Sequence, residues 1–239
     1  MEGYEEEKEK AKQETDVKTF IVPFALENIN EKITILTNKL SKEQIVNQAL
    51  KFHSEDNISE AIKYYNYFIN KGYKDYRVFS NYGDILKNLR KSKEAENSYR
   101  KAIELNPNMV DVHLKMGKLL IENGKLVEAL AYTKKAIQLN PDYLEAYNYL
   151  GATLMYLGKP GEANIVFRSM LKSKKIKPDY QVRAYIKMTI SYIIQGDFKK
   201  TINYMNTVKE LINSGALNEI KNKNKKLQIY IFAKFINSF

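Results

Sequence analysis

Small and large apolar residues recur through the middle of the chain at a constant interval of thirty-four residues. One interval contains Gly83, Ala95, Ala102 and Pro107, the next contains Gly117, Ala129, Ala136 and Pro141, and a further one contains Gly151 and Ala163. A period of this length, built from two helical segments, is typical of a solenoid in which each unit buries its apolar face only against its neighbours. The pattern therefore predicts a stack of helical hairpins.

The interval predicts an all-α fold, an α-solenoid of about five helix-turn-helix units. These units are expected at 42–75, 76–109, 110–143, 144–177 and 182–215. The first and the fifth are weaker versions of the pattern, with Ala49 and Ala61 or Thr189 and Thr201 in the small positions. The segment KSKKIKPDYQ lengthens the connection before the fifth unit by about four residues.

The small residues need a mechanical reason, because glycine inside a helix costs about 1 kcal/mol relative to alanine. We expect the two helices of a hairpin to cross closely where two small residues meet. The expected pairs are Gly83 with Ala95, Gly117 with Ala129, and Gly151 with Ala163. Pro107 and Pro141 are expected to end the second helix of their units.

The two ends of the chain depart from the repeat. Residues 1–41 begin with a segment dense in charges of both signs, which favours disorder, and continue into a pattern at 24–40 that suits a capping helix. Residues 216–239 begin rich in lysine and end in a strongly apolar run. Three roles are open for this ending: a helix that caps the fifth unit, a segment that fills the binding face, or the start of a further domain.

The repeated residues resemble the tetratricopeptide repeat, whose pattern sets large, glycine, alanine, aromatic and proline positions over thirty-four residues. The best match is in the fourth unit, with Tyr147, Leu150, Gly151, Ala163 and Phe167, whereas Thr133 stands where an aromatic residue is usual. The array is also similar to the N-terminal repeat modules that some bacteria place ahead of transferase domains.

The resemblance implies that the first helix of each unit lines a concave binding face. By phase, the candidate partner-binding residues are Ser80, Asp84, Lys87, Leu114, Lys118, Ile121, Asn148, Ala152, Met155, Ile186, Ile190 and Ile193. This set is mixed in its middle and apolar toward the C-terminal end, which suits an amphipathic helix or an extended peptide.

The net charge of +11 raises the question of nucleic-acid binding, so its distribution matters. Residues 1–41 hold nine acidic and six basic side chains, while residues 172–239 hold fourteen basic and four acidic ones. Lysine outnumbers arginine 34 to 5, as AT-rich coding would produce without selection for a basic surface. Nucleic-acid binding through the basic C-terminal third is therefore an alternative and not the leading expectation.

No constellation in the sequence points to catalysis. There is no cysteine, the two histidines are sixty residues apart, and the glycines do not form a phosphate-binding loop. We therefore predict no catalytic residues, no cofactor and no metal site.

The sequence lacks a secretory signal and an apolar run long enough to span a membrane, so a cytoplasmic protein is expected. The leading hypothesis is a non-catalytic scaffold that binds a protein or peptide. The alternative is a targeting module or remnant of a glycosyl-, sulfo- or methyltransferase without its catalytic domain. The oligomeric state stays open.

Overall fold

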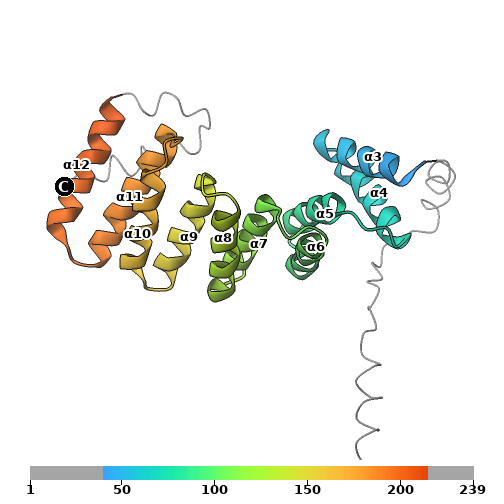
Figure 1. Cartoon of the computed structure of the whole chain (residues 1–239), viewed down its shortest axis with the longest axis horizontal. Helices are drawn as coiled ribbons and strands as arrows, with labels where there is room; N and C mark the ends of the chain where they lie inside the picture. The colour runs from blue at the N-terminus through green and yellow to red at the C-terminus, as the bar shows by residue number, and fades with distance from the viewer. Residues whose placement is uncertain (1–39, 215–239) are drawn as a thin grey trace, which may run out of the picture. The chain divides into compact units, whose positions relative to one another are not determined.

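The computed structural model describes residues 40–214, and within them the chain forms ten helices and no strands (Figure 1). Successive helices pair into five hairpins. They are α3 (Lys42–Ser54) with α4 (Ile58–Asn70), α5 (Tyr76–Asn88) with α6 (Ser92–Leu105), α7 (Val110–Glu122) with α8 (Leu126–Leu139), α9 (Leu144–Tyr156) with α10 (Pro160–Leu171), and α11 (Pro178–Ile194) with α12 (Phe198–Asn213). The predicted all-α solenoid is confirmed. The extensions at 1–41 and 216–239 lie, but for Leu40 and Ser41, outside the described residues.

Each hairpin packs on the next along the chain. The second helices α6, α8 and α10 contact the following first helices α7, α9 and α11, and α9 also contacts both α7 and α11. Pro107 and Pro141 end α6 and α8 as expected, since the residues before them, Asn106 and Asn140, are extended.

The turn inside each hairpin contains one residue in the left-handed region, always at the same place in the repeat. Glycine fills that place in the last three hairpins, as Gly124, Gly158 and Gly196, with φ between 70° and 74°. Asp56 and Arg90 hold it in the first two, with φ of 59° and 60°. Glycine reaches this region without steric cost, whereas Asp56 and Arg90 do not. The turn therefore keeps the same backbone conformation in the first two hairpins although their residues are less suited to it.

The helix glycines make room for a side chain of the partner helix. A Cβ atom added at Gly83 would lie 2.6 Å from the ring of Tyr99, and one at Gly117 would lie 2.8 Å from Thr133 Cγ2. A Cβ atom at Gly151 would overlap the ring of Phe167. The backbone oxygen of Ala129 lies 3.8 Å from the Cβ atom added at Gly117, so that expected pair does meet, and the residue four positions after each alanine also reaches into the gap.

The fifth hairpin begins earlier than expected. The first four hairpins start at 42, 76, 110 and 144, where the predicted units begin, but α11 starts at Pro178 and not at residue 182. Proline is well suited to the first turn of a helix, because its fixed φ matches and its missing N–H needs no partner there. α11 thus has 17 residues where α5, α7 and α9 have 13, and the connection before it, 172–177, is two residues longer than 106–109 and 140–143.

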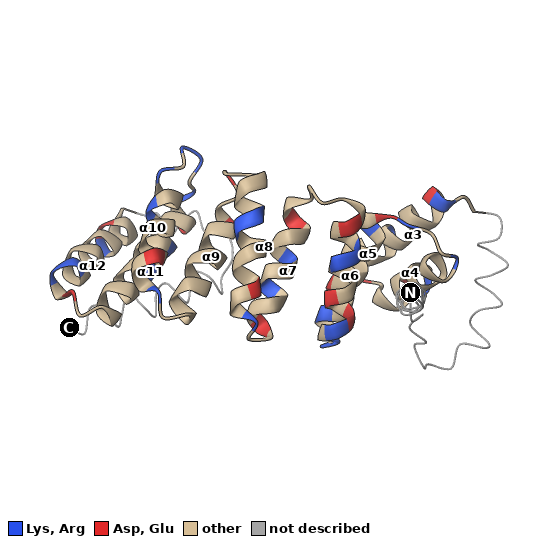
Figure 2. Ribbon diagram, turned by 60° about the horizontal axis from the view of Figure 1, so that its bottom comes forward, with Lys and Arg blue, Asp and Glu red and all other residues tan. Residues whose placement is uncertain are grey.

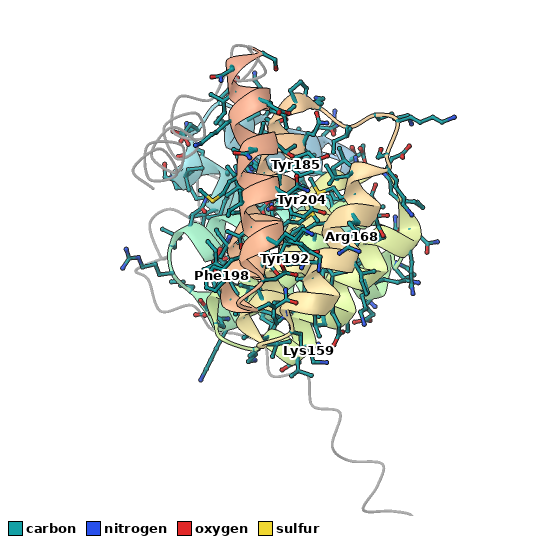
Figure 3. All side chains as sticks on the ribbon, turned by 90° about the vertical axis from the view of Figure 1, so that its left-hand side faces the viewer. Lys159, Arg168, Tyr185, Tyr192, Phe198 and Tyr204 are labelled. Atoms are coloured by element: carbon teal, nitrogen blue, oxygen red, sulfur yellow. The ribbon has the colours of Figure 1, made fainter. Side chains whose placement is uncertain are left out.

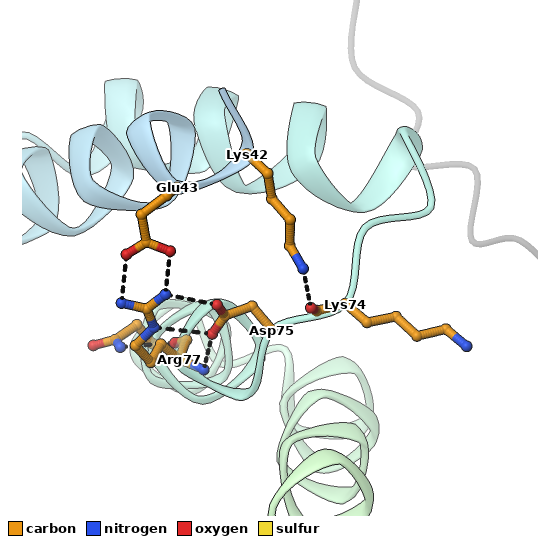
Figure 4. A network of polar contacts seen from close by, with 6 residues as sticks. Lys42, Glu43, Lys74, Asp75 and Arg77 are labelled. Carbon is orange, nitrogen blue, oxygen red and sulfur yellow. Dashed lines mark hydrogen bonds and ion pairs between the residues drawn. The ribbon is translucent and has the colours of Figure 1, made fainter. Parts of the chain in front are cut away.

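The first hairpin is joined to the second by a network around Arg77 at the start of α5 (Figure 4). The Arg77 guanidinium donates to both carboxylate oxygens of Glu43, at 2.9 and 2.8 Å, and to those of Asp75, at 3.1 and 2.8 Å. Asp75 also caps α5 by accepting from the Arg77 backbone N–H. Burial raises the pKa of Asp75, but the hydrogen bonds and charge of Arg77 outweigh burial and bring the pKa below its ordinary value.

The C-terminal end of the described array is held by a tyrosine cluster between α10, α11 and α12 (Figure 3). Arg168 donates to the Tyr192 hydroxyl at 2.6 Å, and the ring of Tyr192 stacks on that of Tyr204 with centroids 5.3 Å apart. The Tyr185 ring lies 5.9 Å from the Tyr204 ring. These contacts hold α12 on α11. They involve only one side of α12.

The other side of α12 carries Phe198 and Ile202, both largely exposed. In the preceding hairpin the same repeat positions are covered by the next first helix: Asn164 is 2% exposed, and the Pro160 carbonyl accepts from Ser191 of α11 at 3.0 Å. Ile202, the counterpart of Asn164, is 60% exposed. If residues 227–239 supply the predicted cap, Ile202→Glu should raise their hydrogen-exchange rates about tenfold, because a buried isoleucine contact contributes more than 1 kcal/mol.

Val127→Glu is the matched control, because Val127 is an exposed apolar residue on α8, away from α12. It should leave the exchange of residues 227–239 unchanged. Equal exchange in the wild type and in Ile202→Glu would contradict a cap at this place.

Candidate functional site

The predicted binding residues lie on four successive first helices, α5, α7, α9 and α11, but they differ in burial. Ser80 and Leu114 are buried, Ile193 is exposed, and the other nine are half-buried. Leu114 belongs to a core cluster with Ala136 and Ala146, so it offers no surface to a partner. Ile186 packs against the buried Val182, as do Leu211 and Ile212 of α12. The remaining residues form what we call the first-helix face: Asp84, Lys87, Lys118, Ile121, Asn148, Ala152, Met155, Ile190 and Ile193.

Lys115 of α7 links the first helices α5 and α7 by polar contacts. Its ammonium group donates to Asp84 at 2.7 Å and to the Ser80 hydroxyl at 3.2 Å, both on α5, and pairs with Asp111 of its own helix at 2.9 Å. Asp84 also accepts from the hydroxyl of the buried Tyr99 at 2.7 Å. Burial lowers the pKa of Lys115, but the hydrogen bonds and charges of the two carboxylates more than reverse this and leave the pKa above its ordinary value.

Two further ion pairs cross between first helices. Lys87 of α5 pairs with Glu122 of α7 at 2.7 Å, and Lys118 of α7 pairs with Glu145 of α9 at 2.7 Å. The Lys118 ammonium also lies 4.8 Å from the centroid of the Tyr149 ring. The charged residues predicted for binding, Asp84, Lys87 and Lys118, are thus already paired inside the protein.

The same repeat positions on α9 and α11 carry no such pairs. Ala152 and Met155 occupy the places of Asp84 and Lys87, and Ile194 occupies the place of Glu122. Within residues 40–214 no ion pair joins α9 to α11. Figure 2 shows the change: α6 and α7 carry Lys, Arg, Asp and Glu side by side, whereas α9 is tan over nearly its whole length. Ile193 and Ile194 at the end of α11 and Tyr156 at the end of α9 are exposed.

Two cations on α11 also belong to this part of the molecule. Lys187 stands at the repeat position of Lys115, and Arg183, one turn earlier, stands at the position of Asp111. Lys187 is half-buried, and burial and then the charge of Arg183 lower its pKa. Arg183 lies over the ring of Tyr180, 5.8 Å from its centroid, and neither cation has an acidic partner in the described residues. Arg183, Lys187 and Ile194 extend the first-helix face defined above, and the open half of the extended face consists of Ala152, Met155, Arg183, Lys187, Ile190 and Ile194.

Sequence reasoning placed neither Lys115, Arg183 nor Lys187 among the site residues. The signal was present as opposite charges on successive first helices, such as Asp84 and Lys115, thirty-one residues apart. A comparison of the same repeat positions between units would have found both the paired lysine and its unpaired counterpart.

The described residues show no arrangement suited to a metal. No group of three His, Asp or Glu side chains within residues 40–214 could hold a metal ion. His53 lies beside Tyr65, and His113 is buried with its Nε2 atom 2.8 Å from the Pro107 carbonyl. No helix in the described part of the chain is long and apolar enough to cross a lipid bilayer.

Comparisons with known proteins agree with the repeat. The family model described as "Tetratricopeptide repeat" matches residues 90–154. A solved structure of MamA is similar with a TM-score of 0.66 and 19% identity, over 76% of this chain and 97% of that one. The structure of YrrB is similar with a TM-score of 0.66 and 18% identity, over 82% of this chain and 95% of that one. No curated protein sequence matches the chain.

At these identities the solved structures show the fold, while the family model identifies tetratricopeptide repeats at residues 90–154. The residues of the family model include Gly117, Ala129, Ala136 and Gly151, the positions that define the period. The five stacked hairpins of residues 40–214 have the fold of tetratricopeptide repeat proteins.

Proposed function

We propose that the protein is a non-catalytic scaffold that binds a segment of another protein along the open half of its first-helix face. The observation that carries this proposal is that the same repeat positions differ between the two pairs of first helices. On α5 and α7 the facing positions satisfy one another by ion pairs, whereas on α9 and α11 they are apolar or unpaired.

An apolar stretch bordered by polar groups is the kind of surface on which a peptide gains affinity, because burial of its apolar side chains removes them from water. Ile194 and Tyr156 are exposed, so they lose contact with water only if something covers them. YrrB, one of the similar structures, is described as having an unusual peptide-binding site, which agrees with this use of the fold.

The test is the selection of peptides from a displayed random library on the full chain, followed by titration of the best binders by fluorescence anisotropy. Ile194→Glu should weaken binding about tenfold or more, because it places a charge where an apolar side chain of the peptide is expected. Ile165→Glu is the matched control: Ile165 is 63% exposed on α10, against 61% for Ile194, but it lies on a second helix.

Both substitutions are at exposed positions, so neither should unfold the array. If Ile194→Glu and Ile165→Glu weakened the selected peptides equally, binding would not take place on the first-helix face.

A further inference from the structure

The open half contains two positive charges without a negative partner in residues 40–214, whereas the equivalent lysine on α7 is paired with carboxylates. Lys115 and Lys187 occupy the same position of the repeat, on α7 and α11. Lys115 is balanced by two carboxylates, Asp84 of the preceding first helix and Asp111 one turn earlier on its own helix. For Lys187 the same two places hold Ala152 and Arg183, so one carboxylate is missing and the other is replaced by a second cation.

This imbalance is costly for a half-buried group. Removing an ammonium group from water is unfavourable unless an opposite charge or good hydrogen bonds compensate. Lys187 has neither within the described residues, and its neighbour Arg183 adds repulsion, which agrees with the direction of its pKa. The two side chains lie one turn apart on the same helix face, so both can reach a single anionic group.

We propose that Arg183 and Lys187 bind an acidic side chain of a peptide whose apolar neighbours cover Ile190 and Ile194. This inference rests on the proposed function and names the chemistry of the partner: an aspartate or glutamate set among apolar residues. The carboxylate would take the place that Asp84 and Asp111 take beside Lys115, and the apolar side chains would cover the isoleucines that follow Lys187 on α11.

The premise has a test that needs no ligand. Lys187→Met should raise the midpoint temperature of the free protein by about 2–4 °C, because it removes an uncompensated charge and keeps the apolar stem. Lys115→Met is the matched control and should lower the midpoint temperature, since it leaves Asp84 and Asp111 without their cation. A fall for Lys187→Met would overturn the premise.

Binding is tested with two fluorescein-labelled peptides, one of alternating leucine and glutamate and one of alternating leucine and glutamine, titrated against the full chain. The glutamate peptide should bind more tightly, and added salt should weaken it. Lys187→Gln and Arg183→Gln should each cost it about tenfold in affinity, whereas Lys187→Arg should keep most of it. The glutamine peptide should not distinguish Lys187→Gln from the wild type.

The outcomes separate this inference from the proposed function. Suppose that both peptides bound the wild type equally, bound Ile194→Glu more weakly and bound Lys187→Gln as tightly as the wild type. The proposed binding face would then be supported, and an acidic partner would be ruled out. Loss of binding on amidation of the peptide's C-terminus would assign the anion to a terminal carboxylate and overturn the side-chain assignment. A thymidine oligonucleotide that displaced the glutamate peptide at equal concentration would overturn it in favour of phosphate.

Discussion

Gly151→Ala is expected to lower the free energy of unfolding by about 1–3 kcal/mol, although alanine is the better helix former. The added methyl group would overlap the ring of Phe167, which is fully buried between α9 and α10. A ring enclosed on all sides cannot move away without shifting its neighbours, so the crowding outweighs the gain in helix propensity, which is about 1 kcal/mol. Chemical denaturation followed by circular dichroism measures the difference.

The chain offers a matched control for this prediction. Gly161 lies in α10 with nothing within 4 Å of an added Cβ atom, so Gly161→Ala should leave stability unchanged or raise it slightly. In the background of Phe167→Leu, where the ring is absent, Gly151→Ala should cost much less. Equal effects of Gly151→Ala in the two backgrounds would show that the ring is not the cause.

Asp84→Ala is expected to lower the free energy of unfolding by about 2–3 kcal/mol, because the Asp84 carboxylate accepts hydrogen bonds from two donors that are shielded from water. The substitution leaves the Tyr99 hydroxyl without its acceptor and removes one of the two carboxylates beside Lys115. Asp84→Asn, which keeps an acceptor oxygen and loses the charge, should cost less than the alanine substitution. Equilibrium denaturation at neutral pH gives both values.

Glu122→Ala provides the comparison for an exposed ion pair. Glu122 is more exposed than Asp84 and, within residues 40–214, pairs only with Lys87, so its loss should cost less than about 1 kcal/mol. A cost for Asp84→Ala no greater than that for Glu122→Ala would mean that the Lys115 cluster contributes no more than a surface pair.

The pH dependence of the cluster follows from the direction of the Lys115 shift. Its pKa is raised in the folded protein, so the folded state holds this proton more tightly than the unfolded chain does. The stabilisation is fully present below the unfolded value, about 10.4, and is lost as the pH rises through the higher folded value. The difference between wild type and Asp84→Ala should therefore persist at neutral pH and shrink above about pH 10.

The period of the sequence predicted the fold closely because small residues and prolines act locally. Pro107 and Pro141 end their helices through the conformation of one preceding residue, which can be read directly from the chain. The early start of α11 was missed because Pro178 was read as part of a connection, although proline is also a favourable first residue of a helix.

The candidate site was harder to predict, because it depends on how far side chains reach between units. The position of a residue within the repeat does not predict that Leu114 is covered by Ala136 and Ala146, or that Lys115 reaches across to Asp84. Nor does it predict that Gly151 makes room for the ring of Phe167. Periodicity gives the direction of a side chain from its helix, while its partner depends on the packing of two helices.

The distribution of ion pairs among the first helices has a consequence for how the array responds to its solvent. Charged contacts join α3 to α5, α5 to α7 and α7 to α9, and none in residues 40–214 joins α9 to α11. Dissolved salt screens partly exposed ion pairs, whereas sulfate strengthens the burial of apolar surface. The N-terminal part of the described stack should therefore gain less stability from ammonium sulfate than the C-terminal part, so that ionic conditions change which end of the array opens first.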